Sequence, residues 1–103
     1  MDKIKKALIS TVEALLTLNP LLSHSSYQRK DKNGDKVTCF SIFGFEVDKA
    51  SQLPQEAKDV IKFAKQLGHN ATYLPETKFT DSGSIYIGPT NNDKTVADGI
   101  GAL

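Results

Sequence analysis

The sequence predicts a single small α+β domain whose elements follow the order α-β-β-α-β-β. Two stretches repeat their apolar residues at helical spacing, and an Asn-Gly dipeptide separates two runs of strand-forming residues. Because hairpins join neighbouring strands, we expect a mainly antiparallel sheet that carries two amphipathic helices. Residues 1–88 are assigned to this domain. Residues 89–103 are rich in Asn, Asp and Gly, and we expect a loop and a flexible C-terminal tail there.

The first expected helix spans residues 2–18. Asp2 can cap its start, and Asn19-Pro20 ends it because proline disfavours helical geometry in the residue before it. Apolar side chains fill one half of the helical wheel, namely Ile4, Leu8, Ile9, Val12, Leu15, Leu16 and Leu18. This arc is wide, so we expect the helix to pack deeply or against two neighbours, and we predict a homodimer.

A hairpin is expected over residues 24–47, because Asn33-Gly34 is typical of a two-residue type I′ turn. That turn would place Tyr27 opposite Phe40. It would also create two pairs of opposite charge beside the turn, which are Lys32 with Asp35 and Asp31 with Lys36. These pairs support the expected register.

The second strand of this hairpin is apolar on both faces. Alternation assigns one face to Val37, Cys39, Phe43, Phe45 and Val47. The other face receives Phe40 and Ile42, with Tyr27 beside them. The favoured interpretation is a central strand with one helix on each face of the sheet. The alternative is that the second face binds another molecule.

The second expected helix spans residues 54–67, with Pro54 in its first turn and Gly68 at its C-terminal stop. Its buried stripe would consist of Ala57, Val60, Ile61, Ala64 and Leu67. A second hairpin is then expected, with strands near 76–80 and 84–88 and the turn at residues 81–83.

Composition excludes several classes of protein. The 103 residues include 13 basic and 12 acidic side chains, and this near balance argues against a dedicated nucleic-acid or membrane-surface protein. A single cysteine, Cys39, cannot form an intramolecular disulfide and favours a reducing compartment, so we expect a cytoplasmic protein. No stretch approaches the roughly 20 apolar residues of a membrane span.

No motif predicts catalysis, a metal site or a cofactor. Residues 31–36 alternate Asp and Asn as a calcium loop does, but Lys36 stands where the loop needs glycine. Gly83 and Gly88 have the spacing of a phosphate loop, but Pro89 replaces the required lysine. Cys39 with His24 or His69 could form a nucleophile and its base, yet a mid-strand cysteine is usually a buried hydrophobe. We therefore expect a non-enzymatic protein.

Elimination favours a small module that binds another protein and occupies its surface, as inhibitors, antitoxins, immunity proteins and phage-type regulators do. Such a module would block its partner sterically through an aromatic-centred patch with charged residues at the rim. The candidate partner-binding residues are Tyr27, Phe40, Ile42, Arg29, Lys30 and Lys32.

Two alternatives stay open. A nucleic-acid-binding domain would use the basic hairpin tip and a lysine stripe on the second helix, formed by Lys58, Lys62 and Lys65. A lysine stripe is, however, usually just the solvated face of a helix. The second alternative is an enzyme whose site is assembled from polar residues too scattered in the sequence to form a motif.

Overall fold

The computed structural model describes residues 2–30, 34 and 36–88 and confirms the expected α-β-β-α-β-β order. Two α-helices, one short 3₁₀-helix and a four-stranded antiparallel sheet form the described part of the chain. The elements are α1 (Asp2–Leu18), β1 (Ser23–Lys30), β2 (Lys36–Phe45), η1 (Ala50–Gln52), α2 (Gln55–Gln66), β3 (Ala71–Leu74) and β4 (Gly83–Ile87). The predicted tail at 89–103 lies outside the described residues.

Helix α1 has the predicted bounds, and its apolar arc supplies Leu8, Val12 and Leu15 to the core, all fully buried. The side-chain amide of Asn19 donates a 3.0 Å hydrogen bond to the carbonyl oxygen of Leu15. The backbone amide of Asn19 donates to the same oxygen at 3.1 Å, so both nitrogen donors of Asn19 close the last turn of the helix. Leu18, at the last turn, is exposed rather than packed.

Helix α2 follows its predicted pattern closely. Ala57, Val60 and Ala64 are buried. Pro54 precedes the first helical residue and acts as the N-cap. Gly68 has a φ of 90°, in the left-handed region that glycine adopts readily, and its amide donates to the carbonyl oxygen of Lys65. The predicted stop at Gly68 is therefore confirmed.

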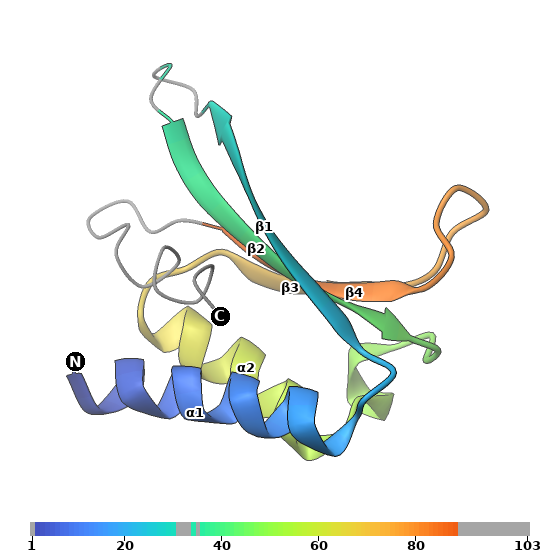
Figure 1. The fold of residues 1–103 in the computed structure, drawn as a ribbon, viewed down its shortest axis with the longest axis horizontal. Helices are drawn as coiled ribbons and strands as arrows, with labels where there is room; N and C mark the ends of the chain where they lie inside the picture. The colour runs from blue at the N-terminus through green and yellow to red at the C-terminus, as the bar shows by residue number, and fades with distance from the viewer. Residues whose placement is uncertain (1, 31–33, 35, 89–103) are drawn as a thin grey trace.

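The sheet has the strand order β1-β2-β4-β3, and every neighbouring pair is antiparallel. Both helices lie on the same face of this sheet and pack against each other (Figure 1). The expectation of one helix on each face is therefore wrong. The apolar stripes of α1 and α2 together cover one side of a small sheet, and no helix of the described residues lies on the opposite side.

The register of the first hairpin differs by one residue from the prediction. Tyr27 lies opposite Cys39, and Ser26 lies opposite Phe40. Lys36 faces Lys30 rather than Asp31. The expected pair of Lys32 with Asp35 lies outside the described residues. A one-residue slip transfers a side chain to the other face of the sheet, so Tyr27 and Phe40 point to opposite faces.

The second hairpin also differs from the prediction. Its first strand is β3, at residues 71–74, and not the segment 76–80. Pro75 directly follows β3 and has no amide hydrogen to continue the ladder. Residues 75–82 form the connection, in which the amide of Thr77 donates to the hydroxyl of Thr80. The expected second strand is confirmed as β4, displaced by one residue.

The hydrophobic core fills the space between the helices and the sheet. Its largest fully buried side chains include Phe40, Ile42, Ile85 and Ile87 on the strands and Leu8, Val12, Leu15 and Val60 on the helices. These strand residues pair directly, with Phe40 opposite Ile87 and Ile42 opposite Ile85. Directly opposite residues share one face, so this pairing identifies the helix-covered face of the sheet.

Candidate functional site: the open face of the sheet

The face of the sheet that carries no helix presents a second set of alternating side chains. The strand registers place there Ser25, Tyr27, Cys39, Ser41, Phe43, Thr72, Leu74, Ser84 and Tyr86. Three of them are large apolar or aromatic side chains with substantial exposure: Tyr27 is 43% exposed, Phe43 38% and Leu74 51%. We call this set the open face. An exposed group of this kind on a small protein commonly marks an interaction surface.

A β-bulge at Gly44 determines which phenylalanine belongs to the open face. Phe43 pairs with Ser84 and Phe45 with Gly83, so Gly44 is an extra residue in β2. Its φ of 115° lies where side chains are strained, and its amide donates a 3.0 Å hydrogen bond to the hydroxyl of Ser82. The bulge keeps Phe43 on the open face and turns Phe45 into the core.

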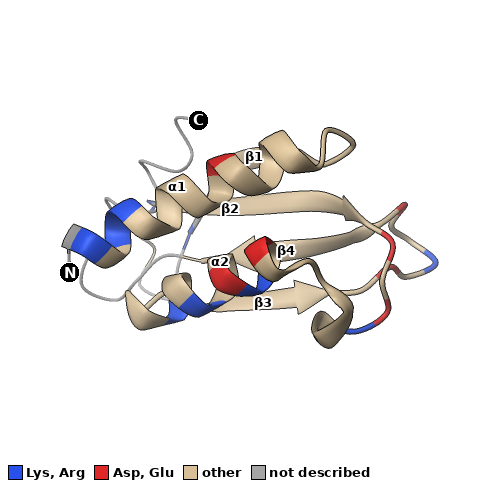
Figure 2. Ribbon diagram, turned by 90° about the horizontal axis from the view of Figure 1, so that it is seen from below, with Lys and Arg blue, Asp and Glu red and all other residues tan. Residues whose placement is uncertain are grey.

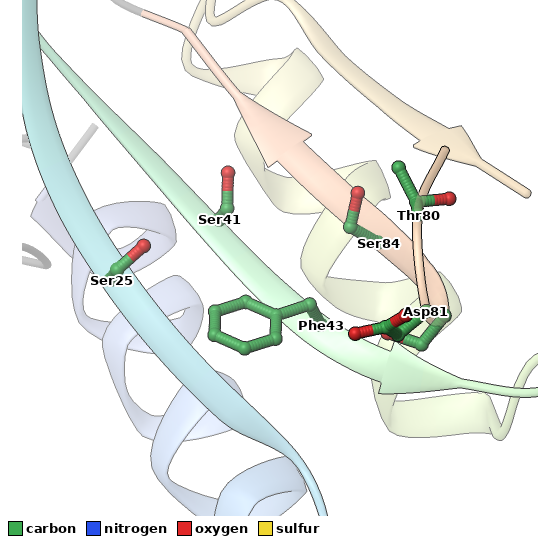
Figure 3. A pocket seen from close by; sticks show the side chains of 7 residues that line it. Ser25, Ser41, Phe43, Thr80, Asp81 and Ser84 are labelled. Atoms are coloured by element: carbon green, nitrogen blue, oxygen red, sulfur yellow. The ribbon is translucent and has the colours of Figure 1, made fainter. Parts of the chain in front are cut away.

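A shallow hollow of about 360 Å³ lies on the open face around Phe43. Its lining residues come from three strands and the β3–β4 connection: Ser25, Ser41, Phe43, Thr80, Asp81, Ser82 and Ser84. Figure 3 shows the aromatic ring of Phe43 between β1 and the β3–β4 connection, with the side chain of Asp81 near it. A second hollow of about 280 Å³ adjoins the first and shares Thr80, Ser82 and Ser84 with it.

Most polar side chains of the first hollow form no hydrogen bond or ion pair within the described residues. Within the described residues, the hydroxyls of Ser25, Ser41 and Ser84 and the carboxylate of Asp81 have no hydrogen-bond or ion-pair partner. Ser82 differs, because it accepts the bond from Gly44. The hollow therefore combines one accessible aromatic ring, one carboxylate and three hydroxyls that a bound group can use.

The cysteine and the two histidines do not lie together in one site. Cys39 is fully buried on the open-face side of β2, and its sulfur lies 3.4 Å from the hydroxyl of Tyr86. His24 pairs with Ile42 on the other side of the sheet and contacts the ring of Phe40. His69 is buried, and its Nδ1 lies 2.6 Å from the carbonyl oxygen of Gly88. Across the described part of the chain, no three His, Cys, Asp or Glu side chains gather as a metal site would need.

The predicted partner-binding residues do not form one surface. Tyr27 and Lys30 are exposed, as predicted for a surface. Phe40 and Ile42 are fully buried under the helices, so the structure corrects their placement on a binding surface. The side chain of Arg29 and all of Lys32 lie outside what the structure describes. The one-residue error in register is the cause, because it had assigned Tyr27 to the face of Phe40 and Ile42.

The lysines named for the nucleic-acid alternative are all exposed on α2. Lys58, Lys62 and Lys65 lie on the side of the helix that faces away from the core. The lysines near the start of α1 lie at the same end of the helical layer as the last turns of α2, as Figure 2 shows. Glu56 and Asp59 lie near the start of α2, one on each side of Lys58 in the sequence.

Sequence reasoning missed the residues that make the hollow. Phe43 was assigned to the same face as Phe45 because the bulge at Gly44 went unrecognised. Asp81 and Ser82 were interpreted only as turn residues. A usable signal is nevertheless present, because serines alternate with aromatic residues in both Ser25-Ser26-Tyr27 and Ser41-Ile42-Phe43. Such alternation is typical of a strand face that meets water rather than a core.

The fold and this surface define the class as a small two-layer α+β domain in which both described helices lie on one face of the sheet. Comparison with known protein families, curated proteins and solved structures finds no significant match for this chain. Among the described residues, no helix has the length and apolar character needed to cross a membrane.

Proposed function

We propose that this protein is a small non-enzymatic binding module that occupies the surface of a partner protein through the open face of its sheet. This is the mode of action of inhibitors, antitoxins, immunity proteins and small regulators. The open face replaces the predicted Tyr27/Phe40/Ile42 patch as the binding surface.

One observation supports this proposal most strongly. Both helices cover the same side of the sheet, and the opposite side, which no described helix covers, carries the exposed side chains of Tyr27, Phe43 and Leu74. Protein interfaces are enriched in aromatic residues, and their binding energy concentrates in a few anchors near the centre. Phe43 is such a candidate anchor, because it lies on an inner strand and borders the hollow.

The hydrogen-bonded strands would hold the open face in place, so the backbone of the module would change little on binding. The face is built on paired strands, and the bulge that orients Phe43 is held by the hydrogen bond from Gly44 to Ser82. A surface that is already ordered loses less conformational entropy on binding than a mobile loop does. Only the exposed side chains and the 75–82 connection would then have to adjust.

The test is capture of the partner by tagged protein from a lysate of the source, followed by purification of the captured protein and a titration with open-face variants. Phe43→Ser removes the central ring, and Ser25→Arg fills the hollow without removing any core atom. We expect each variant to weaken binding by at least about tenfold, in the range typical of interface anchors.

The matched control is Leu21→Ser. Leu21 is 92% exposed in the connection between α1 and β1, so the change removes a still more accessible apolar side chain outside the open face. Circular dichroism and thermal unfolding would show that all three variants remain folded. If both open-face variants bound the partner as tightly as the unaltered protein, the open face would not be the binding surface.

The nucleic-acid alternative is favoured by one observation, the shared position of the lysines at the start of α1 and those in the last turns of α2 at one end of the helical layer (Figure 2). A protein that contacts several phosphates loses affinity steeply as salt rises. Replacing Lys58, Lys62 and Lys65 together by Gln would then reduce the salt dependence of binding to single- or double-stranded oligonucleotides. Unaltered binding by the triple variant would exclude this surface.

A further inference from the structure

We propose that the hollow around Phe43 receives an arginine side chain of the partner protein. This inference rests on the proposed function and specifies the chemistry of the anchor. Three features carry it: an unpaired carboxylate, an exposed aromatic ring and a set of hydroxyls without partners.

The carboxylate of Asp81 provides the charge. Asp81 is exposed at the edge of the hollow and forms no ion pair with any described residue. Lys78, the nearest basic residue in the chain, lies over the ring of Phe79, with its nitrogen 5.1 Å from the ring centroid. An incoming cation would thus meet an acidic group that no described residue already neutralises. A guanidinium can bind a carboxylate through two parallel N–H···O hydrogen bonds.

The ring of Phe43 provides a flat surface in the same hollow as that carboxylate; Figure 3 shows the ring directed toward β1, with Asp81 on the other side of the residue's Cβ. Aromatic faces attract cations, and the planar guanidinium can also stack on the ring while its edges remain free for hydrogen bonds. A lysine ammonium lacks this planar geometry. The combination of ring and carboxylate therefore favours arginine over lysine.

The serine hydroxyls provide hydrogen-bond acceptors for the remaining N–H groups of an arginine. An arginine side chain carries five N–H donors and no acceptor, and two of the donors suffice for Asp81. The hydroxyls of Ser25, Ser41 and Ser84 surround the same hollow and can accept bonds from the remaining donors. The hollow of about 360 Å³ has room for such a side chain. A purely apolar anchor would leave these hydroxyls and Asp81 without water or partner, at a cost in affinity.

The experiment is an NMR titration of isotope-labelled protein with N-acetyl-arginine methylamide. The matched control compound is N-acetyl-citrulline methylamide, which has nearly the same shape but no charge, and the lysine analogue is a second control. We expect the amide signals of Ser41, Phe43 and Ser84 to shift with arginine, with a dissociation constant on the order of millimolar. Citrulline should bind at least about fivefold more weakly.

Two variants localise the effect. Asp81→Asn removes the charge at an exposed position and should weaken arginine binding by about fivefold or more. Phe43→Leu keeps an apolar side chain but removes the ring and should weaken it by about two- to fivefold. Equal binding of arginine and citrulline, shifts at other residues only, or no shifts up to the solubility limit would each overturn the proposal.

This outcome is distinguishable from failure of the proposed function. If Phe43→Ser abolishes partner binding but arginine does not enter the hollow, the binding face stands and the arginine anchor is wrong. If arginine binds in the hollow but Phe43→Ser and Ser25→Arg leave the affinity for the partner unchanged, the proposed function is wrong.

Discussion

The hydroxyl of Tyr73, on the edge strand β3, donates a 2.5 Å hydrogen bond to the carbonyl oxygen of Val47, beyond the end of β2. These residues lie 26 positions apart in the chain. The ring of Tyr73 also packs edge-on against Phe45, with centroids 5.9 Å apart. This contact joins the edge of the sheet to the segment that leads into α2.

Ionisation of the Tyr73 hydroxyl makes the stability of the folded state depend on pH in the alkaline range. Burial first, and then the negative charges of Asp48 and Glu76, raise the pKa of Tyr73 above its ordinary value. The folded state therefore holds this proton more tightly than the unfolded state. The resulting stability is complete below the ordinary tyrosine value of about 10 and is lost as pH rises through the higher folded-state pKa.

We expect Tyr73→Phe to lower the free energy of unfolding at neutral pH by about 0.5–1.5 kcal/mol, because it removes one hydrogen bond. The same variant should lose less stability than the unaltered protein between pH 8 and pH 11, at roughly the values where tyrosine ionises. Urea unfolding at a series of pH values measures both effects. Tyr27→Phe is the matched control, since Tyr27 is exposed. Identical alkaline profiles for the unaltered protein and Tyr73→Phe would contradict this account.

Gly83 leaves the space that the Tyr73 hydroxyl occupies. A Cβ added at Gly83 would overlap that hydroxyl and approach the Tyr73 ring. We expect Gly83→Ala to destabilise the fold by about 1–3 kcal/mol, the usual cost of overpacking. The double variant with Tyr73→Phe should recover part of this loss, because the nearest clash is with the hydroxyl oxygen. Unfolding of both single variants and the double variant gives the coupling energy, and strict additivity would show that the two residues do not interact.

The bulge at Gly44 is a second position that requires glycine. An alanine Cβ there would lie 3.1 Å from the carbonyl oxygen of Leu21, and the backbone has a φ of 115°. We expect Gly44→Ala to lower stability by about 1–3 kcal/mol, the cost of a strained backbone conformation. The fluorescent dye 8-anilinonaphthalene-1-sulfonate (ANS) would report any apolar surface that a shifted bulge exposes. Gly34→Ala provides the comparison, because Gly34 also has a positive φ but nothing lies near its Cβ. A smaller loss at Gly44 than at Gly34 would contradict the packing argument.

Phe40 and Phe43 are a core residue and a surface residue on the same strand, β2. Phe40 is fully buried, whereas Phe43, three residues later, is partly exposed on the opposite face. Truncating a buried phenylalanine to alanine typically costs about 3–5 kcal/mol, so Phe40→Ala should strongly destabilise or unfold the protein. Phe43→Ala should cost considerably less. Chemical denaturation measures the free energy of unfolding of the two variants. Equal losses of this free energy would show that Phe40 and Phe43 do not differ in burial as described.

Much of the fold followed from local sequence pattern. The bounds of α1, the stop of α2 at Gly68 and the order of the elements were predicted, because periodicity, proline and glycine act within a few residues of chain. The burial of Leu8, Val12 and Leu15 followed from the same spacing. Of the candidate site, only Tyr27 was predicted as a binding residue, since the other members come from strands distant in sequence.

Tertiary structure decided the rest. The apolar pattern of β2 was compatible with a helix on either face, and only the packing of α1 against α2 placed both on one side. Register depends on long-range pairing, and an error of one residue exchanges the two faces of a strand. The bulge at Gly44 then placed Phe43 and Phe45, which alternation assigns to one face, on opposite faces of the sheet. The sequence by itself therefore determined which segments are helices and strands. The tertiary structure determined which face remains open, because faces are assigned by contacts between segments far apart in the chain.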